Sequence, residues 1–230
     1  MKKIKIYGEA AWLVSLLLLS FSVAMTAAAD FGLSMIVAPA YILSLRLDAL
    51  SFGQCEYIMQ GALFILMCLA LGKIKPIYFM SFFTCLVYGL MLDGWRAIIP
   101  IFNPVVTAPG SMDMGLRIVF FVLGLVICAF CIALCFYSYI YPQVYDFFVK
   151  AMADRFSIRR DRFKIGFDVS FLILACAMTF IFFARLEGVG VGTVVTTLFN
   201  GLLIGFFSRQ LEKHCDFVAL WPDLEKRFKM

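Results

Sequence analysis

The chain has 230 residues, of which 63% are hydrophobic and 15% charged, with a formal net charge of +5. Soluble domains carry roughly 25% charged residues and 45–50% apolar ones, so a soluble fold of this size could not bury so much apolar surface. No basic run is interleaved with aromatic residues in a polar context, which excludes a nucleic-acid footprint. The composition predicts an all-α integral membrane protein.

Six apolar windows predict transmembrane helices, because each approaches the ~20 residues that a helix needs to cross a bilayer. In chain order they are residues 10–29, 54–72, 76–93, 115–139, 165–184 and 191–208. The first window also resembles a cleavable signal peptide, since Lys2, Lys3 and Lys5 precede it and residues 27–29 are all Ala. We expect it to remain as a helix, because the internal repeat described below requires it.

The segment 31–45, which follows the first window, is apolar but too short to span, and Pro39 interrupts it. Such a segment can enter and leave a bilayer on one side only where it lies against protein or water. Just before it, Asp30 is expected at the outer interface, where charges are solvated.

The second window contains two polar residues, Glu56 and Gln60, that share a helix face because they are four residues apart. Polar groups inside a membrane are costly, so each is a candidate site. The pair could bind a polar solute, or Glu56 could bind a proton. The alternative is an interfacial carboxylate in water, since Glu56 lies near the helix start.

The fourth window carries Cys128, Cys131 and Cys135 on one helical face. Thiolates would suit Cu(I), but small apolar cysteines in a transmembrane helix need no such explanation, and we predict neither a metal site nor a cofactor. His214, the only histidine, lies in the tail. No nucleophile–base pair is present, so we do not expect an enzyme.

The second connector, residues 140–153, repeats the apolar stretch with a proline, Pro142. It also contains Asp146 and Lys150, which would equally suit an amphipathic interfacial helix. Half-helices inside the bilayer are the favoured interpretation for both connectors. At the start of the fifth helix, Lys164 and Asp168 form an i,i+4 pair that is either a structural clamp or part of a solute path.

The run Gly188-Val-Gly-Val-Gly-Thr193 precedes the sixth helix. Alternating glycines at 188, 190 and 192 are poor helix formers, so the backbone is expected to stay unwound there. Thr193, either Thr196 or Thr197, and Asn200 then form a polar stripe at a helix N-terminus, which favours an anionic group. The alternative is helix packing through Gly201-x-x-x-Gly205.

The distribution of positive charge predicts the orientation. With the N-terminus inside, sixteen of the 20 Lys and Arg residues fall on the cytoplasmic side. Both termini are therefore expected in the cytoplasm, with the chain in a bacterial inner membrane.

The two halves share one order of elements: a long helix, a proline-bearing connector and two further helices. Three spans per half predict an inverted repeat, with halves at about 10–96 and 115–210. An outer loop, 97–114, joins them and a cytoplasmic tail, 211–230, follows, so residues 1–230 form one transmembrane domain. The alternative is six helices with an accidental rhythm.

Several motifs resemble those of the YczE/YyaS/YitT-type bacterial membrane proteins over about residues 10–210. They are Asp30-Phe-Gly-Leu-Ser, Ala38-Pro-Ala-Tyr41, Ser51-Phe-Gly-Gln-Cys-Glu-Tyr57 and Tyr88-Gly-Leu-Met-Leu-Asp-Gly-Trp95. The resemblance implies a polytopic inner-membrane protein and supplies no catalytic residues. Tyr141-Pro-Gln143 departs from the family's glycine-rich pattern in the second connector.

The leading hypothesis is a secondary transporter of a small polar or anionic metabolite. Glu56 would be its coupling carboxylate, and the helix end at Thr193 would hold the solute. The residues expected to line the path are Glu56, Gln60, Asp168, Thr193, Thr196 and Asn200. The alternatives are a substrate-binding subunit of an energy-coupled importer and a non-transporting membrane partner. Expected partners are the lipid bilayer and a small solute, with a homo-oligomer left open.

Overall fold

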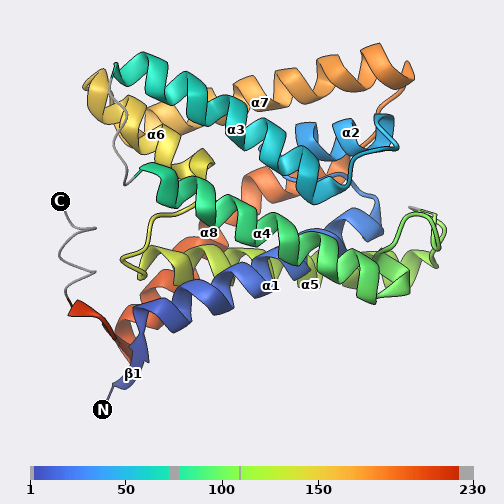
Figure 1. The fold of residues 1–230 in the computed structure, drawn as a ribbon. Coiled ribbons are helices and arrows are strands. Elements are labelled where there is room, and N and C mark those ends of the chain that lie inside the picture. Colours follow the sequence, from blue (N-terminus) through green and yellow to red (C-terminus); the bar gives the residue numbers. More distant parts are fainter. Residues whose placement is uncertain (1–2, 73–77, 109, 223–230) are drawn as a thin grey trace.

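The computed structural model describes residues 3–72, 78–108 and 110–222, and this part of the chain contains eight α-helices (Figure 1). The first half contributes α1 (Gly8–Ala29), α2 (Ala38–Arg46), α3 (Phe52–Leu71) and α4 (Phe79–Ile98), followed by a 3-10 turn, η2 (Pro100–Phe102). The second half contributes α5 (Met114–Phe136), α6 (Val144–Arg155), α7 (Arg160–Phe183) and α8 (Val191–His214). Two strands, β1 (Ile4–Tyr7) and β2 (Cys215–Val218), flank the helices. The all-helical prediction is confirmed.

Among the described residues, five helices are long and apolar enough to cross a membrane: α1, α3, α5, α7 and α8. They match five of the six predicted windows. The sixth window, 76–93, corresponds to α4, although residues 76 and 77 lie outside the described residues. With 20 residues α4 is as long as α3, but it begins and ends later than expected and includes Asp93 and Arg96, which lower its hydropathy.

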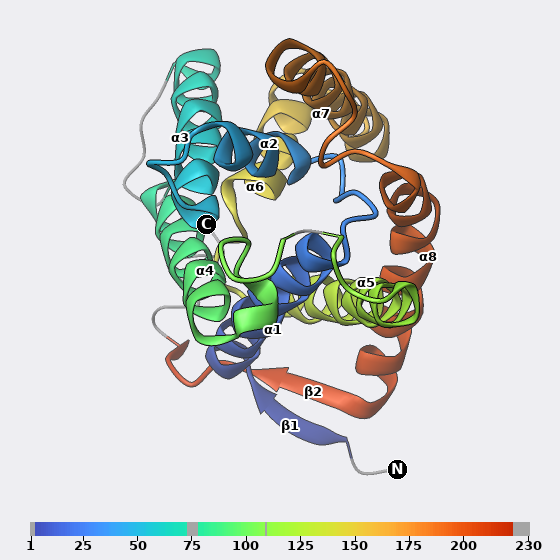
Figure 2. The same cartoon turned by 90° about the vertical axis from the view of Figure 1, so that its right-hand side faces the viewer.

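The long helices run side by side in alternating directions (Figure 1). From the end that carries β1 and β2, here called the strand end, α1, α4 and α7 run to the opposite end, here called the far end, and α3, α5 and α8 run back. In packing, α1 contacts α4 and α5, and α5 contacts α8. Viewed along the bundle, α3 and α8 lie on opposite sides of it (Figure 2).

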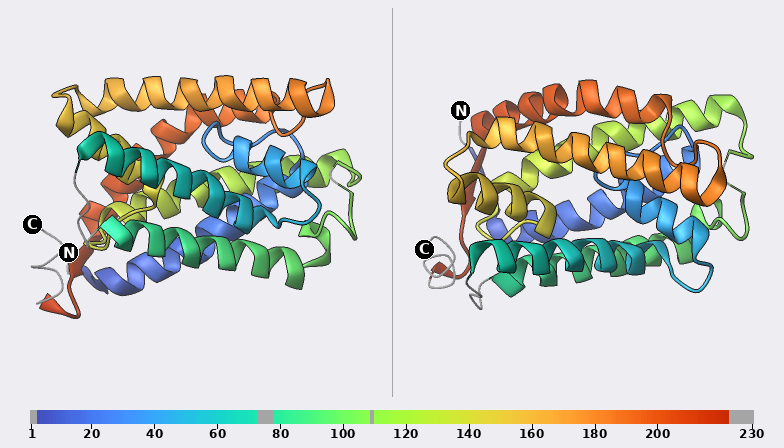
Figure 3. Two further views of the ribbon diagram at one scale, coloured as in Figure 1. Left: turned by 45° about the horizontal axis from the view of Figure 1, so that its top comes forward. Right: turned by 90° about the horizontal axis from the view of Figure 1, so that it is seen from above.

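The two short helices belong to segments that return to the side from which they enter. α2 lies between the end of α1 and the start of α3 at the far end, and α6 lies between α5 and α7 at the strand end (Figure 3). α2 packs on α3 and α7, and α6 packs on α7 and α3. Residues 38–42 of α2 are all buried. Both connectors are therefore packed among other helices.

Glycine decides how closely α3 and α4 approach each other. A Cβ atom at Gly53 would lie 2.3 Å from the carbonyl oxygen of Gly89, and one at Gly89 would lie 2.3 Å from the Tyr57 ring. Asp93 reinforces this crossing, because its carboxylate accepts hydrogen bonds from the Gly53 amide, at 2.8 Å, and from the Ser51 hydroxyl. An acidic group at this position also compensates the positive end of the α3 dipole.

The glycines of α8 make no such crossing. No atom lies within 4 Å of a Cβ built at Gly201, and the nearest neighbour at Gly205 belongs to Arg209 of the same helix, within the described residues. The expectation of close packing at Gly201-x-x-x-Gly205 finds no partner helix there. This face of α8 is open.

The chain ends of the described structure meet in a parallel two-stranded sheet, in the register Ile4↔Cys215 to Tyr7↔Val218. Beyond it, Glu9 accepts hydrogen bonds from the Leu220 and Trp221 amides and from the Tyr139 hydroxyl. The prediction of a tail over 211–230 does not describe residues 211–218. The first part of this segment continues α8 and forms a strand, while 223–230 lie outside the described residues.

Candidate functional site: a buried carboxyl and a far-end cavity

Four polar residues meet inside the protein where the start of α6 reaches α3. This group, the Glu56 cluster, consists of Glu56, Gln60, Gln143 and Tyr145. Glu56 and Gln60 have no exposed surface. The Oε2 atom of Glu56 accepts hydrogen bonds from Gln60 Nε2 and from the Tyr145 hydroxyl, both at 3.1 Å. The alternative of an interfacial carboxylate in water therefore does not describe Glu56.

Gln60 attaches the start of α6 to α3. Its Oε1 atom accepts a hydrogen bond from the Val144 amide at 3.1 Å, and its Nε2 atom donates one to Gln143 Oε1 at 3.2 Å. The first amides of a helix have no partner within the helix, so Gln60 satisfies a group that would otherwise be buried without one. The polar face predicted on α3 thus holds the N-terminus of the second connector helix.

Two atoms of the Glu56 cluster remain unpartnered among the described residues: Glu56 Oε1 and Gln143 Nε2. One can accept a hydrogen bond and the other can donate one. No Lys or Arg of the described chain forms an ion pair with Glu56. An ionised carboxylate buried without a cation is costly, and so is an unsatisfied buried amide. The cluster therefore has the chemistry of a site that binds a proton or a small polar group.

Thr193 and Thr196, in the predicted polar stripe of α8, form hydrogen bonds with the first residues of the same helix and its N-cap. The Thr193 side chain is buried, and its Oγ1 atom accepts a hydrogen bond from the Gly190 amide at 3.2 Å. Thr196 Oγ1 donates to the Thr193 carbonyl at 2.9 Å. Asn200 Oδ1 is buried without a partner among the described residues. Since α8 and α3 lie on opposite sides of the bundle, the structure does not bring these residues together with Glu56 (Figure 2).

Asp168 also lies apart from the Glu56 cluster. Its carboxylate accepts a hydrogen bond from Lys164 Nζ at 2.9 Å on α7, and both side chains are partly exposed. This geometry matches the structural clamp, which was the preferred interpretation of the pair, rather than a solute path.

The glycines before α8 allow two backbone segments to touch. The Gly192 amide donates to the Phe31 carbonyl at 2.6 Å, and Leu33 donates to the Gly188 carbonyl at 3.0 Å. Gly32 has φ +96°, and a Cβ there would lie 2.5 Å from the Gly190 nitrogen. The segment is non-helical up to Gly190, as expected, but it contacts protein backbone at the very amides that were predicted to bind a solute.

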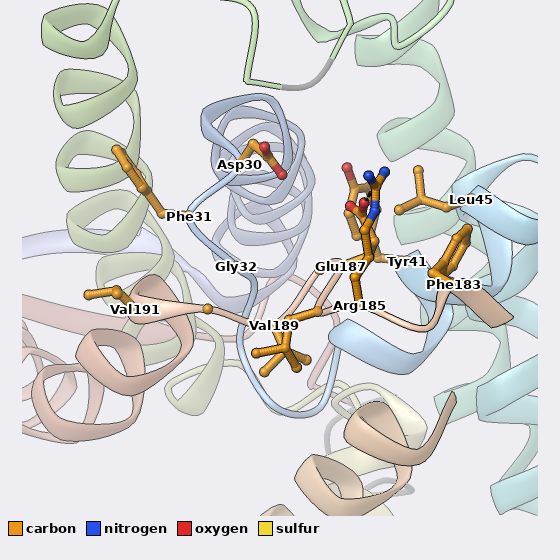
Figure 4. A pocket seen from close by; sticks show the side chains of 13 residues that line it. Asp30, Phe31, Gly32, Tyr41, Leu45, Phe183, Arg185, Glu187, Val189 and Val191 are labelled. Carbon is orange, nitrogen blue, oxygen red and sulfur yellow. Dashed lines mark ion pairs between the residues drawn. The ribbon is translucent and has the colours of Figure 1, made fainter. Parts of the chain in front are cut away.

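A cavity of about 740 Å³ lies beside this contact at the far end (Figure 4). Its polar lining comes from Asp30 at the end of α1, Tyr41 of α2, and Arg185 and Glu187 of the turn after α7. Arg185 and Glu187 form an ion pair at 2.6 Å. Sequence reasoning missed this site, because it assigned Asp30 to a solvated interface and gave no role to residues 185–187.

The end of α1 at Asp30 is fixed by Arg117, whose hydrogen bonds go to backbone carbonyl oxygens. Arg117 of α5 donates to the carbonyl oxygens of Ala29 and Asp30, both at 2.8 Å, while its Nη2 atom lies 3.6 Å from the Asp30 carboxylate. Burial, and then the charge of Glu187, raise the pKa of Asp30, and Arg117 opposes the shift. Burial also raises the pKa of Tyr41 to about 12, so its hydroxyl stays protonated at neutral pH.

A family model matches residues 6–209, from β1 through most of α8. The chain belongs to this family, DUF6198, a family of unknown function. The match covers both the Glu56 cluster and the residues that line the far-end cavity. No curated protein and no solved structure matches the chain. The finer resemblance to YczE/YyaS/YitT-type proteins stays a prediction.

Proposed function

We propose that this DUF6198 protein is a secondary transporter of a small polar metabolite, built from two inverted halves that cross a bacterial inner membrane six times. The far end faces outward and both termini are cytoplasmic, in accordance with the distribution of Lys and Arg.

The strand pairing supports six crossings. β1 precedes α1 and β2 follows α8, and paired strands must lie on one side of the membrane. The chain therefore crosses an even number of times between them. Since α1, α3, α5, α7 and α8 make five, α4 supplies the sixth, and its 20 residues extend for about 30 Å at 1.5 Å per residue.

The packing supports an inverted repeat. The helices at corresponding positions, α1 and α5, α3 and α7, and α4 and α8, run in opposite directions (Figure 1). α2 contacts α3 and α7, whereas α6 contacts α7 and α3, which is the exchange expected of a pseudo-two-fold axis in the membrane plane. In this arrangement α2 and α6 are half-helices that enter from opposite sides.

The observation that carries the proposal is the unpartnered Oε1 atom of Glu56 beside the N-terminus of α6. A buried carboxyl with an unfilled hydrogen-bonding position is suited to exchange a proton during transport. An anionic solute at the start of α8 receives less support, because Gly192 donates to Phe31 and Thr193 donates to Gly190. We therefore propose Glu56 as the coupling group and leave Thr193 as a structural residue.

The test is uptake by proteoliposomes that contain the purified protein and a trapped pH-sensitive dye. A mixture of small polar metabolites is added outside under an imposed pH gradient, and lumenal contents are identified by mass spectrometry. Uptake of at least one solute with accompanying proton movement is expected. Glu56→Gln should abolish the dependence on the gradient, because the amide cannot exchange a proton, and Tyr145→Phe should weaken it by removing one hydrogen bond to Glu56.

Glu212→Gln is the matched control, since this glutamate lies at the exposed end of α8. Its uptake should equal that of the unmodified protein. The proposal fails if no solute enters, or if Glu56→Gln leaves both uptake and its pH dependence unchanged while the protein remains folded.

A further inference from the structure

We infer that the far-end cavity binds an ammonium group, carried either by a small organic amine or by a lipid headgroup. This inference rests on the proposed function and deepens it by naming the class of solute that the outer side receives.

The charges of the cavity favour a cation. Two carboxylates, Asp30 and Glu187, lie on its lining. Figure 4 shows Asp30 on one side and Glu187 with Arg185 on the other. Glu187 is paired with Arg185, and the Asp30 carboxylate forms an ion pair with Arg117 at 3.6 Å. The nitrogens of Arg117 donate to backbone carbonyls, however, so the Asp30 carboxylate accepts no hydrogen bond among the described residues.

A helix end adds to the negative potential. α7 ends at Phe183 beside the cavity, and the last carbonyls of a helix carry partial negative charge. α1 also ends there, at Ala29, but Arg117 occupies the carbonyls of Ala29 and Asp30. The start of α8 opposes this effect, but its Gly192 amide is occupied by the Phe31 carbonyl. The cationic side chain on the lining, Arg185, is 76% exposed, so solvent screens its charge.

The remaining walls suit an organic cation rather than a metal ion. Tyr41 and Phe183 line the side opposite Asp30, and aromatic rings attract ammonium groups electrostatically (Figure 4). The volume of about 740 Å³ exceeds the space that a bare ion requires and falls in the range of small-molecule sites. An ammonium group between Asp30 and Glu187 would reduce the repulsion between two partly buried carboxylates.

The experiment measures the thermal stability of the full chain in detergent, at constant ionic strength, with choline or putrescine as cationic probes and phosphate or glutarate as anionic controls. A ligand that binds the folded state raises the apparent Tm in a saturable manner. We expect both amines to raise the Tm and neither anion to do so. Either anion stabilising the protein in place of the amines would overturn the inference.

Two variants separate binding from folding. Glu187→Gln should weaken amine binding about tenfold or more, the equivalent of one charge-assisted hydrogen bond. Arg185→Gln should strengthen it, because Glu187 would no longer be engaged by a guanidinium at 2.6 Å. Changes in opposite directions are not expected of a merely structural role. Equal affinities in both variants and in the Glu212→Gln control would contradict the assignment.

Nanodiscs distinguish the two sources of the ammonium group. If a headgroup occupies the cavity, phosphatidylethanolamine discs should stabilise the protein and suppress the putrescine shift, whereas phosphatidylglycerol discs should not; Glu187→Gln should abolish the difference. If the ligand is a free amine, putrescine should act equally in both discs. The inference is overturned if neither phosphatidylethanolamine nor putrescine stabilises the protein in either kind of disc.

The binding measurement is independent of transport, because no flux is involved. Amine binding without uptake refutes the transporter alone, and Glu56-dependent uptake without amine binding refutes the cation site alone.

Discussion

Gly53→Ala tests the α3–α4 crossing, because it places a methyl group where the structure leaves no room. The added Cβ would lie 2.3 Å from the Gly89 carbonyl oxygen and 2.5 Å from Asp93 Oδ2. The first of these is backbone, so the helices must separate. Separation also stretches the hydrogen bond from the Gly53 amide to the Asp93 carboxylate, which is 2.8 Å long.

The cost can be estimated from two effects. Overpacking in a tight interior costs about 1–3 kcal/mol, and a lost hydrogen bond to a charged group costs about 1.5–3 kcal/mol. Replacing glycine in a helix returns at most about 1 kcal/mol. The net loss is about 1.5–6 kcal/mol, which at about 2–4 °C per kcal/mol corresponds to roughly 3–24 °C in apparent Tm for a chain of this length.

The assay is thermal unfolding of the detergent-purified protein at one fixed scan rate, since membrane proteins of this kind often unfold irreversibly. Gly201→Ala is the control, because nothing lies within 4 Å of a Cβ at that position among the described residues. Its Tm should be unchanged or slightly higher. A Gly53→Ala protein as stable as the Gly201→Ala protein would refute the close approach of α3 and α4.

Three further changes are informative. Arg117→Gln should lower the Tm, because two charge-assisted hydrogen bonds to the end of α1 are lost, whereas Arg185→Gln, with its exposed side chain, should not. Burial raises the pKa of Asp30, Arg117 opposes this shift and Glu187 adds to it, so folding favours the protonated form. Stability should therefore fall as pH rises above the ordinary pKa of an aspartate, and Asp30→Asn should flatten that profile of Tm against pH. Gly192→Ala should lower the Tm by displacing the contact with residue 31, since its Cβ would lie 2.7 Å from that carbonyl oxygen.

Hydropathy and proline spacing were sufficient to predict the helices and the two connectors, because both signals are local. The same local character explains the shift of α4. The apolar window stops at residue 93, where the charges begin, but the helix continues to Ile98. Both charged residues of this last part of α4 have partners on α3. The Asp93 carboxylate accepts a hydrogen bond from the Gly53 amide, and the Arg96 guanidinium lies over the Phe52 ring, 5.3 Å from its centroid. A hydropathy window averages only neighbouring residues of the sequence, so it does not include these partners on α3.

Half of the Glu56 cluster could be found from the sequence. Glu56 and Gln60 share a helix face, and a polar pair in an apolar helix is conspicuous. Tyr145 and Gln143 come from the other half of the chain, more than 80 residues away, so no spacing rule relates them to α3. Pro142 marks a boundary in the chain before α6, but no local signal singles out Gln143, which is not one of the residues that commonly cap helices.

The far-end cavity could not be predicted from local patterns. Asp30, Tyr41 and Glu187 belong to three separate segments, and each resembles an ordinary interfacial residue in isolation. Only the backbone contact between residues 31–33 and 188–192 brings those segments together. The glycines that make the contact possible are conspicuous in the sequence, but their spacing alone does not tell which segment they face.

The pairing of β1 with β2 also sets the order in which the protein can be completed during synthesis. A ribosome makes β1 first and β2 only after every long helix, since Glu9 and Leu220 are 211 residues apart. Throughout that time the amides and carbonyls of β1 lack their partner strand, and the Glu9 carboxylate lacks two of its donors. A nascent chain that stops after α8 would display β1 without its partner strand, and unpaired strand edges favour aggregation of unfinished products.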